Sequence, residues 1–228
     1  MGTLFVVATP IGNLADISRR ALDALRTVRL IAAEDTRRTR KLLSRHGITT
    51  PVASFYDAVE RPKTPELLAR LAGGESVALV CDAGTPGIAD PGGHLIPQAI
   101  RAGIPVAAIP GPCAAIAALV VSGLPMERFV FEGYLPVKPG KRRKILEAWS
   151  KEHRTIVCYE APHRLVRSLT EILDVVGDVP MSAARELTKQ FEEVRRGRVR
   201  EILAHFQGTP PRGELTLVLR AAPSGNAP

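Results

Sequence analysis

The chain has 228 residues, of which 45% are hydrophobic and only 4% are aromatic, and its formal net charge at pH 7 is +8. This length is enough to bury a substantial core, in one large domain or in two small ones. The low aromatic content argues against a protein that reads single-stranded nucleic acid by stacking many rings on its bases. The positive charge favours an anionic partner, of which RNA and DNA are the commonest.

No run approaches the roughly 20 apolar residues that span a bilayer, so we expect no membrane association. The N-terminus has no basic region before an apolar stretch, which argues against a secretory signal peptide. Cys81, Cys113 and Cys158 are widely spaced in apolar runs, which is typical of reduced thiols in a cytoplasmic protein. The five histidines show no metal-ligand spacing, and we expect no metal site.

The first half of the chain alternates strand and helix signals. Short apolar runs predict strands, and apolar residues at helical spacing predict the helices between them. In chain order we expect strand 4–8, helix 17–28, strand 30–33, helix 36–45, helix 66–71, strand 77–81, helix 94–102 and strand 106–109. This alternation implies an α/β fold with a mostly parallel sheet and helices on both faces.

The segment 110–123 begins with Pro and Gly and continues as a small-residue apolar helix, and we place the domain junction there. The later elements are expected to be strand 128–131, a loop over 134–141, helix 144–150, strand 155–159, helix 165–176, strands 181–185 and 193–196, helix 199–206 and strand 215–220. The predicted domains are 1–112 and 113–221, followed by a flexible tail over 222–228.

The stretch SVALVCDAGTPGIADPGG, residues 76–93, passes from an apolar run into a loop with four glycines. In open α/β sheets, ligands bind outside the carboxyl ends of the strands. Glycine allows backbone angles that side chains forbid, so the main chain can lie against a ligand, and Asp82 and Asp90 offer carboxylates to its hydroxyls or amines. The alternative is a tight turn between strand and helix, which explains one or two glycines but not this density. We therefore predict a ligand-binding loop.

Three more predicted strands end in turns that contain Pro, namely TPIGN at 9–13, PGP at 110–112 and EAPHR at 160–164. If all four strands are parallel and adjacent, their turns line one crevice. The chain has no GxxxxGK[ST], and no GxGxxG after the first strand, which argues against a nucleoside triphosphate or an ordinary dinucleotide. The loops suit a ligand with hydroxyls, an amine and a positive centre better than one with several phosphates.

Seven segments resemble a known family, in order from about residue 3 to residue 220. They are VVATPIGNLADI, AAEDTRRTRKLL, CDAGTPGIADPG, IPGPCAAIAAL, FEGYLP, YEAPHR and ARELTK. They resemble the tetrapyrrole-methylase-like superfamily and, within it, the ribosomal RNA small-subunit methyltransferase I family, whose members 2′-O-methylate a cytidine of 16S rRNA. Ala89 stands where Ser is common before Asp-Pro-Gly, which leaves the backbone role of that loop intact.

The resemblance implies two α/β domains, a mostly parallel N-terminal sheet, a mixed C-terminal sheet and S-adenosylmethionine in the cleft between the domains. It also implies a homodimer that acts on 16S rRNA of the small ribosomal subunit. The cofactor-binding residues that follow from it are Pro10, Asp82, Ala83, Gly84, Pro86, Ile88, Cys113, Ala114, Ala115, Phe131, Tyr159, Glu160 and Leu187.

The sequence has three clusters of Lys and Arg, and the third, over 195–200, is the weakest candidate because nearby acids can pair with its cations; the other two are candidate RNA contacts. Predicted helix 36–45 has no acid after Asp35 to balance its cations, although a solvated helix face is the alternative. The second cluster lies around the loop 134–141, where a solubilising surface loop is an equal alternative. The predicted RNA-binding residues are Arg37, Arg38, Lys41, Arg45, Lys141, Arg142, Arg143, His163 and Arg164. Thr36 is expected to cap its helix rather than to take part in chemistry.

Methyl transfer from a sulfonium to a ribose hydroxyl is an in-line displacement that also needs an acceptor for the hydroxyl proton. The sulfonium is already an activated leaving group, so this chemistry needs no metal. The candidate catalytic residues are Asp35, Arg185, Glu186 and Lys189, with Glu160 as a further proton acceptor. Lys189 serves as a base only if its surroundings lower its pKa. An ion-pair network at the domain interface is an equal alternative for 185–189.

Two other functions are weighed against rRNA methylation. A methyltransferase that acts on a precorrin-type tetrapyrrole would share the cofactor loops, but the basic clusters make less sense for it. A non-catalytic RNA-binding module would not need intact loops in both halves of the chain.

Overall fold

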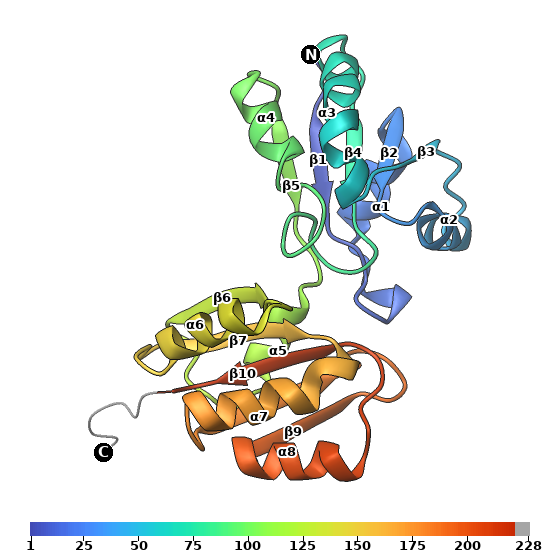
Figure 1. The fold of residues 1–228 in the computed structure, drawn as a ribbon. Helices are drawn as coiled ribbons and strands as arrows, with labels where there is room; N and C mark the ends of the chain where they lie inside the picture. Colours follow the sequence, from blue (N-terminus) through green and yellow to red (C-terminus); the bar gives the residue numbers. More distant parts are fainter. Residues whose placement is uncertain (222–228) are drawn as a thin grey trace. The chain divides into compact units, whose positions relative to one another are not determined.

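The computed structural model describes residues 1–221, and the predicted tail 222–228 lies outside the described residues. The chain divides into two compact units, the first Met1–Cys113 and the second beginning at Ala114. The junction thus falls one residue after the position expected from the sequence. Each unit has a sheet of its own (Figure 1).

The sheet of the first unit is entirely parallel. Its strands are β1 (Leu4–Val7), β2 (Leu30–Ala33), β3 (Val52–Ser54), β4 (Val77–Val80) and β5 (Val106–Ile109), in the order β3-β2-β4-β1-β5. In register, Leu4 of β1 lies opposite Val77 of β4 and Val106 of β5. Strands β2 and β4 are buried along their whole length, which explains why they are continuous apolar runs in the sequence.

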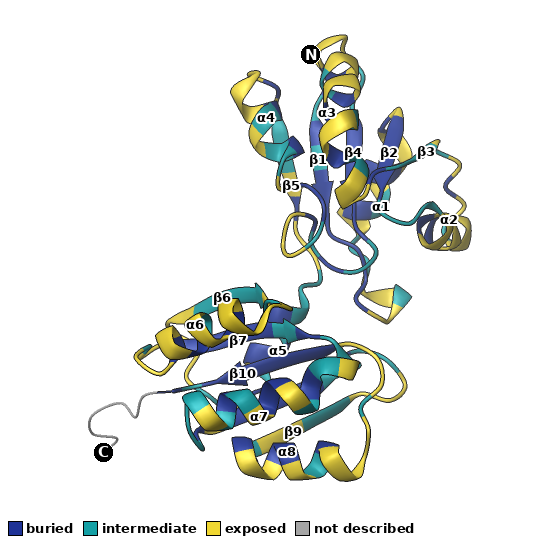
Figure 2. Cartoon of the chain, viewed as in Figure 1, coloured by how far each residue is buried: buried dark blue, intermediate teal, exposed yellow. Residues whose placement is uncertain are grey.

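Four helices cover this sheet, two on each face. They are α1 (Arg19–Thr27), α2 (Thr36–Arg45), α3 (Asp57–Ala72) and α4 (Leu95–Arg101), with a short 3-10 turn, η1 (Leu14–Asp16), before α1. Leu25 of α1 and Leu43 of α2 share one core cluster with Ile31, whereas Leu67 of α3 and Leu95 of α4 share another. Figure 2 shows the buried strands between these helices. The prediction of helices on both faces is confirmed.

Helix α3 begins nine residues earlier than the helix expected at 66–71, and β3 was not expected at all. Pro62 and Pro65 lie inside α3, and two of its four buried residues, Glu60 and Thr64, are polar. The spacing of hydrophobic residues therefore does not predict the first part of this helix, because half of its buried positions are polar. Strand β3 has only three residues, too few for a periodic signal.

The second unit has a mixed sheet, as the resemblance implied. Its strands are β6 (Phe129–Tyr134), β7 (Thr155–Glu160), β8 (Pro180–Arg185), β9 (Glu193–Arg198) and β10 (Leu215–Leu219), in the order β6-β7-β10-β8-β9. Only the β6–β7 pair is parallel, and the other three pairs are antiparallel. Strand β7 is thus in a different sheet from β1, β4 and β5, so the four Pro-containing turns do not belong to one row of parallel strands.

The helices of the second unit are α5 (Ala114–Val120), α6 (Pro139–Trp149), α7 (Leu165–Val175) and α8 (Val199–Gly208), with the 3-10 turn η2 (Pro162–Arg164) before α7. Leu146, Leu169 and Phe206 place α6, α7 and α8 in one core cluster. Helix α6 begins at Pro139, so the basic segment expected in a loop lies on a helix instead. Among the described helices, none is both long and apolar enough to cross a membrane.

Candidate functional site

Three turns that follow adjacent strands of the first unit are fastened to one another. The Thr9 N–H donates to the Gly84 carbonyl at 2.8 Å, and the Gly84 N–H donates to the Thr9 carbonyl at 3.0 Å. The Thr85 hydroxyl donates to the Pro112 carbonyl at 3.2 Å, and the Thr9 hydroxyl donates to the Cys81 carbonyl at 3.1 Å. The turns after β1, β4 and β5 therefore form one continuous loop surface at the carboxyl edge of the sheet.

The glycine-rich loop after β4 adopts a conformation that most residues resist. Gly84 has a φ of +90° and Gly92 a φ of +127°, both in the region that favours glycine. A Cβ at Gly92 would lie only 3.0 Å from Leu79 Cδ2. Ala89 has a φ of +63° although it carries a Cβ, which is strained for such a residue. Strain of this kind clusters at binding sites, in keeping with the predicted ligand loop.

Carboxylates just after β2 and β4 link the turns that follow these two strands. Asp82 Oδ1 accepts the Asp35 N–H at 2.9 Å, and the Glu34 carboxylate accepts the Asp82 N–H at 3.0 Å. Arg38 lies 3.4 Å from Asp82 Oδ2. Burial, together with the charges of Glu34 and Asp82, raises the pKa of Asp90 to about 6. This concentration of negative charge suits a ligand with a positive centre. In the described part of the chain, no group of His, Cys, Asp and Glu side chains is placed to hold a metal ion.

Glu60 holds the far end of the glycine-rich loop, and sequence analysis missed it. Its side chain comes from α3, and the residue is only 8% exposed. Glu60 Oε1 accepts the N–H groups of Gly92, His94 and Leu95 at 3.0, 2.9 and 3.1 Å. Helix α4 has no capping side chain at its own N-cap position, so Glu60 satisfies these otherwise orphaned donors. A distant acid that supplies a cap leaves no local signal in the sequence.

Asp35, rather than Thr36, caps helix α2. Its carboxylate accepts the Arg37 N–H at 2.8 Å and also pairs with the Arg37 guanidinium at 2.9 Å. These hydrogen bonds lower the pKa of Asp35 to about 2. Arg37 occupies both oxygens of this carboxylate, which leaves neither of them free to receive a substrate proton, so the geometry argues against the catalytic role predicted for Asp35.

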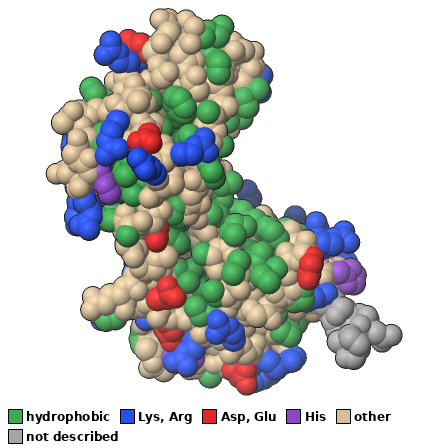
Figure 3. All heavy atoms as spheres, turned by 180° about the vertical axis from the view of Figure 1, so that it is seen from behind, with side chains coloured by type: hydrophobic (Ala, Val, Ile, Leu, Met, Phe, Trp, Pro, Cys, Tyr) green, Lys and Arg blue, Asp and Glu red, His purple; other side chains and the backbone are tan. Residues whose placement is uncertain are grey.

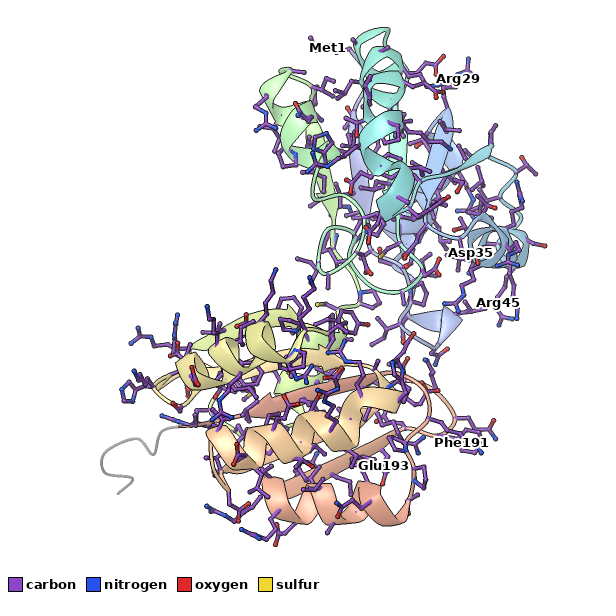
Figure 4. The ribbon with its side chains drawn as sticks, in the orientation of Figure 1. Met1, Arg29, Asp35, Arg45, Phe191 and Glu193 are labelled. Atoms are coloured by element: carbon purple, nitrogen blue, oxygen red, sulfur yellow. The ribbon has the colours of Figure 1, made fainter. Side chains whose placement is uncertain are left out.

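The cations of α2 fall into two groups. Arg37 pairs with Asp35, and Arg38 with Asp82. The remaining cations of the helix, Arg40, Lys41 and Arg45, are exposed and make no ion pair within the part of the chain that is described. Asp35 and Arg45, labelled in Figure 4, mark the two ends of this helix. The second group is therefore the one that is available to an anionic partner.

One member of the second basic cluster, Arg142, is buried rather than exposed. This side chain is only 2% exposed, and its Nε lies 2.5 Å from Glu171 Oε2. It also donates to the carbonyls of Pro136 and Val137 at 2.9 and 3.0 Å. Arg142 thus belongs to the core of the second unit and cannot contact RNA, contrary to the prediction. Its neighbours in the sequence, Lys141 and Arg143, are exposed on α6.

The turn after β7 is fixed by a buried ion pair. Glu160 is 1% exposed, its carboxylate lies 3.1 Å from Arg164 Nε, and it accepts hydrogen bonds from the Ser168 hydroxyl and the Ala161 N–H. Arg164 also donates to the Leu135 carbonyl. These bonds occupy both charged side chains, so the predicted RNA contact of Arg164 and the predicted proton transfer to Glu160 do not fit this geometry. His163, between them, is exposed.

Three of the predicted cofactor residues lie together in the second unit. The Tyr159 hydroxyl accepts the Ala115 N–H at 3.2 Å. The Phe131 ring lies edge-on to Tyr159, with 5.1 Å between ring centroids and 71° between planes. Tyr134 adds a third ring, 5.5 Å from Tyr159. Phe131 and Tyr134 of β6 and Tyr159 of β7 therefore form one aromatic cluster, and the Ala115 N–H links it to the first turn of α5.

The loop after β8 is strained and pinned by ion pairs. Glu186 and Thr188 have φ angles of +53° and +66°. The Lys189 ammonium lies 2.9 Å from the Glu186 carboxylate and 3.0 Å from that of Glu214. The Glu214 N–H also donates to Glu186 Oε1 at 3.0 Å, and a Cβ at Gly213 would collide with the Glu186 carboxylate. Figure 4 labels Phe191, which projects from this loop and is 67% exposed.

The pKa values in this loop favour an ion-pair network. Burial lowers the pKa of Lys189, but its hydrogen bonds to Glu186 and Glu214 outweigh burial and raise that pKa. Burial raises the pKa of Glu186, but the hydrogen bonds that it accepts outweigh burial and lower that pKa. Arg185 pairs with Glu193 at 3.1 Å. Lys189 therefore stays protonated at neutral pH and is unsuited to act as a base.

Comparison with known proteins identifies the fold first. A family model for Tetrapyrrole (Corrin/Porphyrin) Methylases matches residues 3–203. Among solved structures, diphthine synthase has a TM-score of 0.76 at 16% identity, covering 96% of this chain and 90% of its own. The methyltransferase CobJ has a TM-score of 0.74 at 18% identity, covering 100% of this chain and 98% of its own. The chain therefore has the fold of the tetrapyrrole methylases.

Curated relatives show to which family within the tetrapyrrole methylase fold the chain belongs. The relative from Synechocystis is 49% identical over 100% of this chain and 82% of its own length. The relative from Pseudomonas aeruginosa is 55% identical over 85% of this chain and 69% of its own length. The relative from Thermotoga maritima is 47% identical over 96% of this chain and 98% of its own length. All three are named ribosomal RNA small subunit methyltransferase I. The chain belongs to the ribosomal RNA small subunit methyltransferase I family, which confirms the resemblance found in the sequence.

Proposed function

We propose that this chain transfers the methyl group of S-adenosylmethionine to the 2′-hydroxyl of a cytidine in 16S rRNA, in the cytoplasm. The observation that carries the proposal is the fastening of the turns after β1, β4 and β5 into one loop surface, within a chain nearly half identical to curated rRNA methyltransferases over most of its length. A uroporphyrin-III C-methyltransferase with the same fold, at a TM-score of 0.68, was solved in complex with S-adenosylhomocysteine, which supports the choice of cofactor.

The cofactor residues proposed from the first unit are Pro10, Asp82, Ala83, Gly84, Pro86, Ile88 and Cys113. Those proposed from the second unit are Ala114, Ala115, Phe131, Tyr159 and Leu187, together with the backbone of Glu160. The cofactor supplies a methyl group on a positively charged sulfur. The carboxylates of Asp82 and Asp90 favour that charge, and the aromatic cluster around Tyr159 offers flat apolar surface.

Within the loop after β8, we propose that the Glu186 carboxylate accepts the proton of the ribose 2′-hydroxyl. Glu186 Oε1 is taken by Lys189 and by the Glu214 N–H, whereas Oε2 has no hydrogen-bond partner among the described residues. The pair with Lys189 keeps the carboxylate ionised at neutral pH. Lys189 is a positioning residue in this scheme, because it holds the strained loop and the Glu186 rotamer in place.

A methyl-transfer assay with labelled S-adenosylmethionine tests the function. We expect label in 16S rRNA, in a nucleoside whose ribose is methylated, when small ribosomal subunits or naked 16S transcripts are supplied. A precorrin-type tetrapyrrole serves as the control substrate and should remain unlabelled. Label in the tetrapyrrole alone would contradict the proposal, and label on a cytosine base would contradict the 2′-hydroxyl as the acceptor.

We also propose that two copies of the chain associate through the second unit. On α5, Ile116 is 46% exposed and Val120 is 61% exposed. Met126, just before β6, is 49% exposed, and Phe129, the first residue of β6, is 37% exposed. Figure 3 shows hydrophobic side chains gathered on one face of this unit. Exposed apolar patches of this kind mark interaction sites. Sedimentation should report a dimer for the wild type and a monomer for Val120→Asp, and a monomeric wild type would disprove the association.

A further inference from the structure

Helices α1 and α2 form one layer on the same face of the first sheet. Leu25 of α1 and Leu43 of α2 belong to one core cluster. The Arg26 guanidinium of α1 donates to the carbonyl of His46, the C-cap of α2, at 3.2 Å. The Thr50 hydroxyl, in the chain that follows α2, donates to the Leu25 carbonyl at 2.7 Å. The outer sides of the two helices therefore form a single surface.

This surface is far more basic than the opposite face of the same sheet. Within their bounds, α1 and α2 carry eight Lys and Arg residues and one acid, a net charge of +7. Helices α3 and α4 carry four Lys and Arg residues and three acids, a net charge of +1. Figure 3 shows Lys and Arg side chains gathered on the α2 side of the first unit. An anionic macromolecule is therefore attracted more strongly to the face that α1 and α2 cover.

Two cations of α1 are available on this surface. Arg26 pairs with Asp23 at 3.5 Å as well as with the His46 carbonyl. Arg19 and Arg20, in the first turn, are exposed and make no ion pair within the described residues. Because α1 and α2 each follow a parallel strand, both begin at the carboxyl edge of the sheet, where the loops after β1, β4 and β5 lie.

We propose that Arg19 and Arg20 bind backbone phosphates of the substrate RNA and so extend the basic surface of α2 across α1. This inference rests on the proposed function and adds the second helix to the RNA-binding face. Phosphate contacts of this kind fix the register and orientation of a nucleic acid without reading its sequence. Arg19 and Arg20 share three properties with Arg40, Lys41 and Arg45: exposure, no ion-pair partner among the described residues, and a place on the same layer.

The test compares two double variants of equal charge change. Arg19→Gln/Arg20→Gln removes the proposed contacts. Arg61→Gln/Arg101→Gln removes two exposed cations from α3 and α4 on the opposite face, and is the matched control. The dissociation constant for a 16S rRNA transcript is measured between about 50 and 200 mM salt, where such contacts have their largest effect. Removing one phosphate contact to single-stranded RNA lowers the slope of log K against log salt by about 0.7.

We expect the α1 variant to lower that slope by about 1.4, to raise KM for RNA and to leave the dissociation constant of S-adenosylmethionine and kcat unchanged. The control variant should match the wild type in all four measurements. Equal slopes for the two variants would overturn the inference, while methylation of rRNA by the wild type would still support the proposed function. An effect on assembled small subunits but not on naked RNA would also overturn it, since the partner would then be a ribosomal protein.

Discussion

Glu60 and Arg142 are charged side chains that lie almost fully buried, and each makes hydrogen bonds to backbone groups of a neighbouring loop. Charged residues are rarely buried in this way unless they are paired. Removing one partner leaves the other groups buried without a hydrogen bond, which costs about 1–3 kcal/mol for each neutral group. Both residues are therefore expected to matter for stability, and Glu60 also for the loop that it holds.

We expect Glu60→Ala to weaken S-adenosylmethionine binding and to lower the free energy of unfolding by at least about 1–3 kcal/mol, because three backbone N–H groups lose their acceptor. Glu60→Gln keeps a carbonyl oxygen in place and should recover most of the cofactor affinity. The control is Glu66→Ala, which removes an exposed acid of the same helix that pairs with Arg70 at 3.4 Å. Calorimetry with the cofactor and urea unfolding provide the two readouts; equal cofactor affinity in all three variants would contradict the loop-holding role.

Glu171 gives stability a specific dependence on pH. Its hydrogen bond from Arg142 lowers the pKa of Glu171 from 4.5 to about 2 in the folded protein. A lowered carboxylate pKa adds stability at pH values above the unfolded pKa, and this contribution is lost as the pH falls from about 4.5 towards 2. Glu171→Gln should therefore lose less stability than the wild type between neutral pH and about pH 3. Parallel urea-unfolding curves for the two proteins over this range would show that the pair adds nothing.

At the scale of a single element, the strained loop after β8 makes a sharp prediction. Lys189→Ala leaves the Glu186 and Glu214 carboxylates without the cation that they share, so the loop should relax and Glu186 should move. Glu186→Gln keeps the shape of the side chain but removes its charge. We expect both variants to lower turnover by roughly 10²–10⁴-fold with little change in cofactor affinity. Arg195→Gln, which removes an exposed partner of Glu193, is the control, and wild-type turnover in both loop variants would exclude them from the reaction.

The elements differ in how well the sequence predicts them. Strand β2 and helix α2 have the predicted bounds, because a buried apolar run and a capped amphipathic segment are local patterns. Helix α3 was predicted only in its last third, since Pro62 and Pro65 and a partly polar buried face hide it. Helix α6 starts at Pro139, in a Pro- and Gly-containing segment that favours a loop on local grounds.

The candidate site shows the same division. The glycine-rich loop and its partners after β1 and β5 were predicted, because glycine and proline mark turns wherever they occur. The roles of Asp35, Arg142 and Arg164 were not, because each depends on which side chain or backbone group lies opposite in the folded unit. The sequence shows that Arg142 and Arg164 are present. Only the folded structure shows that each of them is already paired with a carboxylate of the second unit.

At the scale of the whole molecule, whose net charge is +8, helices α1 and α2 of the first unit carry a net charge of +7 within their bounds. Lys41→Glu/Arg45→Glu reverses two exposed cations of α2 and is expected to lower both the affinity for rRNA and its salt slope. Reversing Arg37 alone should have a smaller effect, since it already pairs with Asp35. Binding of a 16S transcript at several salt concentrations gives the measurement, and indifference of the α2 double variant would reduce that helix to a solvated surface.

The strand order β3-β2-β4-β1-β5 has a consequence for co-translational folding on the ribosome. Strand β1 is made first, yet both of its neighbours, β4 and β5, come from residues 77–80 and 106–109. At a synthesis rate of about 5–20 residues per second, β4, the first strand that can pair with β1, is synthesised on the order of several seconds after it. During this interval the apolar strand β1 has no partner strand in the sheet. The bridge between Thr9 and Gly84, which joins two of the loops proposed to bind the cofactor, can form only after β4 has been synthesised. A nascent chain arrested before β4 should therefore be sensitive to proteases and bind chaperones, whereas one that includes β5 should resist digestion.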